Sequence, residues 1–297
     1  MLRDSSAMFV NRRDFLLMSA SAASLSVFGQ TDRSLAATDV DLLHQYEALM
    51  SNATPDVVAK VRGLREYVDL AAGLETAPIQ AKPSATPISS RSTDLLIHFE
   101  VSSGEVYEQR YQAPTWPKGK SGVTIGIGYD LGYAEEHAIR KDWSDYLESA
   151  TVDRLILASG VIGRPAKKLA AQLSSIKIPF EVAHRQFLTI MQPRYVGITE
   201  RALPNFGDLP EDCRGALVSL VYNRGASFGI AETKDKHGRY KEMRTIRKLM
   251  IENKYDEISD QLLQMRRLWA GNKDLKGLVI RRELESTLFL IGLSGLS

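Results

Sequence analysis

The chain has 297 residues, of which 44% are hydrophobic and 25% are charged, and its formal net charge is +2. This is the composition of a globular protein with one good-sized domain plus extensions, and the balance of charge gives no case for nucleic-acid binding. The single cysteine excludes an intrachain disulfide and a multi-cysteine metal site, and the five scattered histidines lack metal-ligand spacing, so we expect no metal and no other cofactor.

The first 37 residues have the order of an export signal. Two arginines at positions 12–13 precede Phe-Leu-Leu at positions 15–17 and a mild apolar stretch rich in Ala and Ser. This order resembles a twin-arginine signal peptide, with cleavage after Ala36 or Ala37. The stretch is shorter than the roughly 20 apolar residues that a membrane span needs. We therefore expect a periplasmic or secreted protein with no membrane anchor after cleavage; the alternative is a chance arginine pair before a buried helix.

Residues 38–92 are expected to form an extension of the main domain. Apolar residues recur near helical spacing over residues 38–73, which predicts a small helical hairpin. Residues 74–92 hold three prolines among Ala, Ser and Thr, a composition typical of a linker. The main domain is then expected to occupy residues 93–297.

A short helix capped by Ser92 or Thr93 is predicted to run through Phe99, with Glu100 at its C-terminal end. A carboxylate there faces the negative end of the helix dipole beside apolar residues, and both effects favour its protonated form. This environment suits a general acid, although a lone glutamate is more often simply solvated. Residues 101–120 are expected to form an irregular, aromatic-rich wall.

Residues 121–132 read SGVTIGIGYDLG, and their alternation predicts a half-buried strand. The polar face would be the floor of a binding cleft. Thr124 and Asp130 would lie about 20 Å apart on a straight strand, so sharing one site requires a bend. Gly126 and Gly128 permit it, which predicts a hairpin or a strong twist. The apolar face would consist of Val123, Ile125, Ile127 and Tyr129.

From residue 134 onward the pattern is almost wholly helical. The segment at 211–222 is apolar enough to be a central buried helix, and Gly225 is a natural cap at its end. The predicted helical segments are 134–147, 152–158, 164–173, 181–191, 211–222, 243–251, 255–268 and 277–291.

Two short motifs lack the surrounding secondary structure that their usual function requires. Residues 225–229 match the GxSxG pattern of serine hydrolases, but that pattern needs a strand before the serine, and a helix is predicted there. Residues 126–132 contain three glycines with GxGxxxG spacing, but the βαβ unit around a phosphate loop is missing. The carboxylates remain as the groups that could do chemistry.

The order of several motifs resembles the phage-type lysozymes of glycoside hydrolase family 24. In that family a glutamate on the first helix precedes a TIGxG hairpin, as Glu100 precedes residues 122–128 (GVTIGIG) here. Residues 216–225 are similar to the family's ALxSLxFNxG pattern, and residues 277–285 to its late GLxxRRxxE helix. The resemblance covers residues 93–289 and implies an α+β, mainly α, lysozyme-like fold with a small β-hairpin lobe and a larger helical lobe.

The chain departs from that family in the position of one carboxylate. Phage lysozymes have their catalytic aspartate between the glutamate and the threonine, and no aspartate lies between Glu100 and Thr124. The related muramidase pesticin has its aspartate just after the threonine, and Asp130 fits that version. The resemblance implies Glu100 as general acid, Asp130 as second carboxylate and Thr124 as the hydroxyl that orients water, with Glu105 as the alternative acid. Expected substrate contacts are Gly126, Gly128, Tyr129 and Asn223.

The implied activity is that of a muramidase, which hydrolyses the N-acetylmuramic acid to N-acetylglucosamine bond in the glycan strands of peptidoglycan. Inversion requires the two carboxyl groups to stand about 6.5–9.5 Å apart, which leaves room for a water. The alternative is a non-catalytic peptidoglycan-binding protein on a lysozyme-like fold, because fold alone does not guarantee chemistry. A weaker alternative, which rests on the pesticin-like motif, is a secreted effector used against competitors.

Overall fold

The computed structural model describes residues 31–60 and 81–295. Residues 1–30 of the predicted signal at 1–37, and residues 61–73 of the predicted N-terminal hairpin, lie outside the described residues. The chain divides into two compact units, Met1–Val40 and Asp41–Ser297, and the second contains the whole of the predicted main domain. The domain boundaries at residues 38 and 93 stay a prediction.

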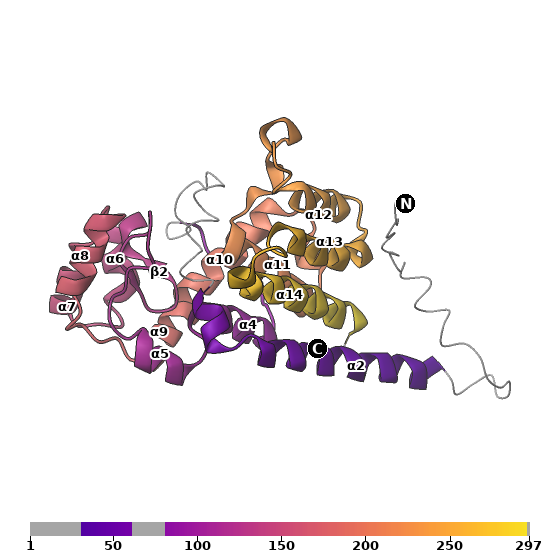
Figure 1. The fold of residues 1–297 in the computed structure, drawn as a ribbon, viewed down its shortest axis with the longest axis horizontal. Helices are drawn as coiled ribbons and strands as arrows, with labels where there is room; N and C mark the ends of the chain where they lie inside the picture. Colours follow the sequence, from indigo (N-terminus) through magenta and orange to yellow (C-terminus); the bar gives the residue numbers. More distant parts are fainter. Residues whose placement is uncertain (1–30, 61–80, 296–297) are drawn as a thin grey trace, which may run out of the picture. The chain divides into compact units, whose positions relative to one another are not determined.

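The described residues form a mainly helical structure with one two-stranded antiparallel sheet, as is consistent with a lysozyme-like fold (Figure 1). The elements in chain order are α2 (Thr31–Asn52), α4 (Ser90–Val101), α5 (Gly104–Arg110), β1 (Thr124–Ile125), β2 (Tyr129–Asp130), α6 (Glu136–Trp143), α7 (Ser149–Ile156), α8 (Arg164–Gln172), α9 (Phe180–Gln186), α10 (Gln192–Ala202), α11 (Glu211–Arg224), α12 (Lys241–Ile251), α13 (Ile258–Gln264) and α14 (Lys276–Ser294).

Within the larger unit the elements gather at two ends (Figure 1). The β-hairpin, α6, α7 and α8 occupy one end, and α11 to α14 the other. Helix α11 contacts α4, α10 and α14, and α14 also packs on α13. A π-helical segment, Phe187–Met191, joins α9 to α10, which run between the two ends. We call the first end the hairpin lobe and the second end the helical lobe.

Helix α11 lies at the centre of the helical lobe. Each of its residues from Asp212 to Arg224 is buried, as expected for a helix enclosed on all sides. It ends at Gly225, which has a φ of 72°, and the predicted glycine cap is confirmed. Helix α4 approaches α11 so closely that a Cβ placed on Gly215 would overlap the side chain of Ser92. The two helices are therefore fixed against each other at this crossing.

The predicted bend in the glycine-rich strand is confirmed as a β-hairpin. β1 and β2 pair with Thr124 opposite Asp130, and the turn between them contains Gly126 and Gly128. Both glycines have positive φ, 55° and 78°, a conformation that other residues adopt at a cost. The predicted apolar face is buried throughout. The tip is tied to α11, because the Tyr222 hydroxyl donates to the Ile127 carbonyl oxygen at 3.0 Å.

Three helix predictions need correction in the first part of the domain. Helix α4 is capped by Ser89, whose side chain accepts from the Ser92 amide, and it continues to Val101. Glu100 therefore lies in its last turn rather than beyond its end. The predicted irregular wall contains helix α5, which begins after Ser103 because that side chain accepts from the Val106 amide. Helix α2 begins at Thr31, earlier than predicted.

Helix α10 is missing from the prediction, which ends the preceding helix at residue 191. The chain stays helical through Pro193, which lies in the first turn of α10 directly after a π-helical segment. The π-helical segment before it absorbs the change in backbone register. Pro193 therefore does not end the helical segment.

Residues 81–89 contain no helix, as their prolines predict, but they are bonded to the helical lobe. The Ser84 amide donates to the Pro193 carbonyl oxygen at 2.9 Å, and the Thr86 hydroxyl to the Glu200 carboxylate at 2.8 Å. The Arg214 Nε donates to the Pro87 carbonyl oxygen at 2.7 Å. This stretch is therefore part of the packed surface of the domain.

We expect replacement of Gly128 by alanine to destabilise the protein. The new Cβ would lie 2.5 Å from the Tyr222 Oη and 3.2 Å from the Glu100 Oε2, in a backbone with positive φ. The expected loss is about 1–3 kcal/mol in the free energy of unfolding, measured by urea denaturation.

The matched control is Gly207→Ala, because a Cβ there meets nothing within 4 Å and the φ is not positive. It should leave the unfolding free energy unchanged or slightly raised. Equal effects of the two substitutions would contradict the role given to Gly128.

Candidate active site

Glu100 projects from α4 into the space between the hairpin and the helical lobe. Its side chain is only 2% exposed. One carboxylate oxygen, Oε1, lies 3.7 Å from the Arg281 Nη1 of α14. The other faces the hairpin turn, since a Cβ built on Gly128 would meet Oε2 at 3.2 Å. The structure therefore brings Glu100 to the tip of the predicted hairpin, as the hypothesis of a shared site requires.

Thr124 and Asp130 are direct cross-strand partners, and their side chains share one face of the hairpin. Partners of this kind have Cβ atoms about 4.5–5.5 Å apart. Thr124 is held firmly, because its amide donates to the Thr115 carbonyl oxygen at 2.7 Å and its own carbonyl accepts from the Thr115 amide at 2.9 Å. The bend therefore places Thr124 and Asp130 next to each other, whereas a straight strand would hold them far apart.

The Asp130 carboxylate also has a structural task. One oxygen accepts from the Gly122 amide at 3.0 Å, and the other accepts from the Gly132 amide at 2.9 Å. These two bonds tie the strand that enters the hairpin to the chain that leaves it. Asp130 is half-buried, and its orientation is set by the backbone. A fixed carboxylate next to Thr124 can serve as a permanent anion, in addition to its role in the fold.

The four predicted substrate contacts fall in different surroundings. Gly126 and Gly128 form the hairpin turn, and Gly128 faces Glu100. The Asn223 side chain is buried and accepts from the Arg282 Nη2 at 3.2 Å. Tyr129 points into the core. The structure therefore brings the glycines to the site, whereas Tyr129 and Asn223 face inward.

Tyr129 belongs to a buried polar cluster behind the hairpin. Its hydroxyl donates to the Asp142 carboxylate at 2.9 Å, and Arg194 binds the same carboxylate through two nitrogens, each at 2.6 Å. Burial raises the pKa of Tyr129 well above its usual value. The cluster joins β2, α6 and α10, so its effect on the site is to fix the hairpin from behind.

A second buried polar cluster was not predicted as part of the site, although its helix contributed to the family resemblance. The Arg281 Nη2 donates to the Ser219 carbonyl oxygen at 3.0 Å, and the Ser219 hydroxyl donates to the Glu285 Oε1 at 2.7 Å. Arg282 Nη2 bonds the same oxygen at 2.8 Å. The cluster fixes the guanidinium that faces Glu100. The signal was present in the sequence as two arginines and a glutamate three and four residues later on an apolar helix.

Burial shifts the pKa values in this second cluster in opposite directions. It raises the pKa of Glu285 and lowers the pKa of Arg282 to about 9, because removal from water disfavours both charged forms. Their mutual attraction opposes both shifts. The cluster is therefore an interior ion pair held together by several hydrogen bonds.

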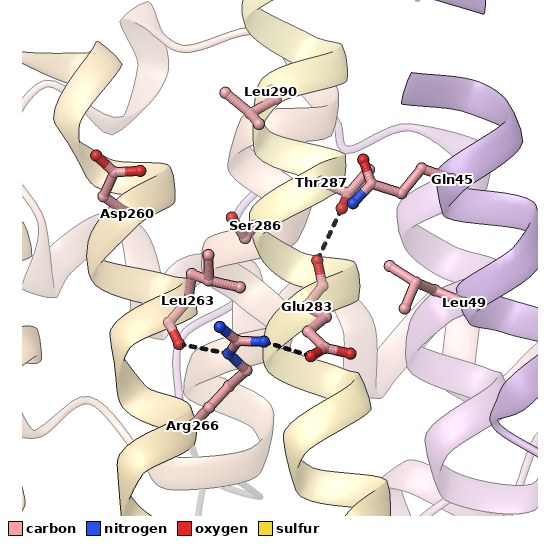
Figure 2. Close-up of a pocket in the computed structure, with 9 residues that line it drawn as sticks. All are labelled: Gln45, Leu49, Asp260, Leu263, Arg266, Glu283, Ser286, Thr287 and Leu290. Carbon is pink, nitrogen blue, oxygen red and sulfur yellow. Dashed lines mark hydrogen bonds and ion pairs between the residues drawn. The ribbon is translucent and has the colours of Figure 1, made fainter. Parts of the chain in front are cut away.

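The described residues form a groove with a volume of about 250 Å³ elsewhere in the unit, between α2, α13 and α14 (Figure 2). An ion pair, Arg266 Nη1 to Glu283 Oε1 at 2.5 Å, lies in it. Glu283 faces this groove, whereas Arg281 and Glu285 face α11. Its lining contains none of the predicted site residues: Gln45, Leu49, Asp260, Leu263, Arg266, Glu283, Ser286, Thr287 and Leu290.

Two absences bear on the class of site. Among residues 31–60 and 81–295, no group of three His, Cys, Asp or Glu side chains is arranged to hold a metal ion. Over the same part of the chain, no helix has both the length and the apolar character needed to cross a membrane.

Comparison with curated proteins finds a distant, partial similarity to phage endolysins. The chain is 37% identical over 86 residues to a SAR-endolysin of Enterobacteria phage P21, and 37% identical over 86 residues to a SAR-endolysin of Bacteriophage PS119. Each match covers 29% of this chain, and 43% and 42% of the two relatives. The chain thus spans less than half the length of the curated relatives it matches. No protein-family model matches the chain.

We expect Asp130→Ala to lower the free energy of unfolding, because it leaves the Gly122 and Gly132 amides without their acceptors. An unsatisfied backbone group costs about 1–3 kcal/mol. Asp130→Asn keeps one acceptor oxygen and should cost less. Urea denaturation of both variants measures the difference.

Asp145→Ala is the control, since Asp145 is exposed and takes part in no described ion pair. It should unfold like the unaltered protein. If Asp130→Ala is as stable as Asp145→Ala, the two backbone bonds do not hold the hairpin.

Proposed function

We propose that the protein is a peptidoglycan muramidase that hydrolyses the bond between N-acetylmuramic acid and N-acetylglucosamine. The observation that supports this most directly is the position of the Glu100 carboxylate against Gly128, in the hairpin that also holds Thr124 and Asp130. The partial similarity to phage endolysins points to the same substrate class. Export by the predicted twin-arginine signal would bring the enzyme to the periplasm or the exterior, where peptidoglycan lies.

In the proposed reaction Glu100 donates a proton to the glycosidic oxygen as the bond to the sugar breaks. A water held by the Thr124 hydroxyl attacks the anomeric carbon from the opposite face, and Asp130 accepts its proton. An inverting glycosidase needs its two carboxyl groups about 6.5–9.5 Å apart, and the proposal requires this separation of Glu100 and Asp130.

Arg281 would act as a positioning residue in this reaction. Its guanidinium faces Glu100, stacks over the Phe99 ring at 5.2 Å, and is fixed by Ser219 and Glu285. A buried carboxylate without such a partner would be free to turn away from the hairpin. The sugar-binding surface would be completed by Gly126 and Gly128, whose lack of side chains lets a ring approach the backbone.

A second candidate is a peptidoglycan-binding protein without catalytic activity, and two observations favour it. Glu100 is almost completely buried and faces a guanidinium. Both oxygens of Asp130 are engaged with backbone amides. Each carboxylate would then have a structural role only, and the hairpin would bind glycan without cleaving it.

The decisive experiment compares Glu100→Gln with Glu105→Gln on purified peptidoglycan, with the products analysed for their ends. Glu105 is exposed on the neighbouring helix α5 and bonds only Gln109, at 3.4 Å, among the described contacts of its side chain. Loss of a general acid lowers the turnover rate by about 10²–10⁴-fold. We expect that loss for Glu100→Gln and near-normal activity for Glu105→Gln.

Each outcome decides between the candidates. Reducing muramic acid ends that disappear in Glu100→Gln support the proposal. Loss in Glu105→Gln alone would assign the acid to the other glutamate. Anhydro ends would indicate a lytic transglycosylase. Binding without products would establish the second candidate, and full activity in both variants would overturn the mechanism.

A further inference from the structure

Two arginines, one in the Glu285 cluster and one close to it, have N–H groups that the fold does not satisfy. Arg224 ends α11 and is 3% exposed, and Arg282 lies on α14 and is 0% exposed. In the described part of the chain, Nε and Nη1 of both arginines have no hydrogen-bond partner. Buried donors of this kind are rare in folded proteins and call for a specific explanation.

The two guanidiniums lie beside the same indole ring. The Arg224 Cζ is 5.3 Å from the Trp269 ring centroid, and the Arg282 Cζ is 5.9 Å from it. Arg224 also lies 5.7 Å from the centroid of the Tyr240 ring. Contact with the aromatic faces stabilises the cations, but it does not provide a hydrogen-bond acceptor for their free N–H groups.

The nearby carboxylates leave the free N–H groups of both arginines unbonded. Glu242 is paired with Arg267 at 2.5 Å. Glu285 bonds Arg281 and Arg282 through Oε1, and among the described residues its Oε2 has no hydrogen-bond partner. The described contacts give Arg224 one acceptor, the Arg239 carbonyl oxygen at 2.7 Å, and no ion pair. Burial, and next the charge of Arg239, lower the pKa of Arg224 to about 10, so it is still a cation at neutral pH. The side chains around Arg224 and Arg282 therefore carry more positive than negative charge.

We propose that Arg224 and Arg282, beside Trp269, form a binding site for a small inorganic anion of the halide class, such as chloride. A single negative charge there would balance the excess cation and accept from the free Nε and Nη1 groups. The near-complete burial of both arginines and of Trp269, which is 3% exposed, selects for small size. A carboxylate or phosphate on a large molecule could not enter. The test of this site needs no sugar substrate.

The test measures urea unfolding of the full chain in sodium chloride and in sodium gluconate at equal ionic strength. A ligand that binds only the native state lowers the unfolding equilibrium constant by the factor 1 + [L]/Kd, about 11-fold at ten times Kd. We expect that fall in chloride and not in gluconate, and broadening of the chloride NMR line on addition of the protein.

Arg224→Met and Arg247→Met separate a site from a general salt effect. Arg247 is exposed on α12 and has no described ion pair. We expect Arg224→Met to lose the difference between the two salts and Arg247→Met to retain it. Equal stabilisation of the unaltered protein by chloride and gluconate, or a chloride-specific effect that persists in Arg224→Met, would overturn the proposal. The measurement on the unaltered protein decides the matter even if Arg224→Met does not fold.

Discussion

The Glu285 carboxylate is shared by two guanidiniums and a hydroxyl in a space closed to water, and the helical lobe is arranged around it. Removal of ions from water costs several kcal/mol each, and the cost is offset only if every partner is in place. Loss of one partner from such a cluster typically costs about 3–5 kcal/mol. The cluster therefore fixes α14 against α11, and it points Arg281 at Glu100. The candidate acid therefore faces a guanidinium whose orientation is set by this interior ion pair.

The hairpin brings together two polar side chains that would lie far apart on one straight strand. Two glycines with positive φ reverse the chain, and Thr124 and Asp130 become neighbours. Asp130 then closes the loop through the Gly122 and Gly132 amides. One carboxylate thus has a structural role in addition to the catalytic role that we propose for it. This is why its contribution to stability has to be separated from its contribution to chemistry.

Local pattern was enough to predict the hairpin and the central helix. Alternation predicted a strand, and the hypothesis that Thr124 and Asp130 share one site predicted a bend at Gly126 and Gly128. A helix apolar on all faces could only be buried. Helices α5 and α10 were missed because a cap at Ser103 and a proline at position 193 were not interpreted as helix starts. The inward orientation of Tyr129 and the partners of Arg281 depend on contacts between distant segments, which periodicity does not contain.

The crossing of α4 and α11 at Gly215 has a consequence for the reaction geometry. Ser92 and Glu100 are eight residues apart on one helix, about 12 Å along its axis. Because a helix moves as a rigid rod, any atom added at position 215 would displace α4 and alter the distance from the acid to the hairpin. The spacing between Glu100 and the hairpin therefore depends on a residue without a side chain, which lies on another helix.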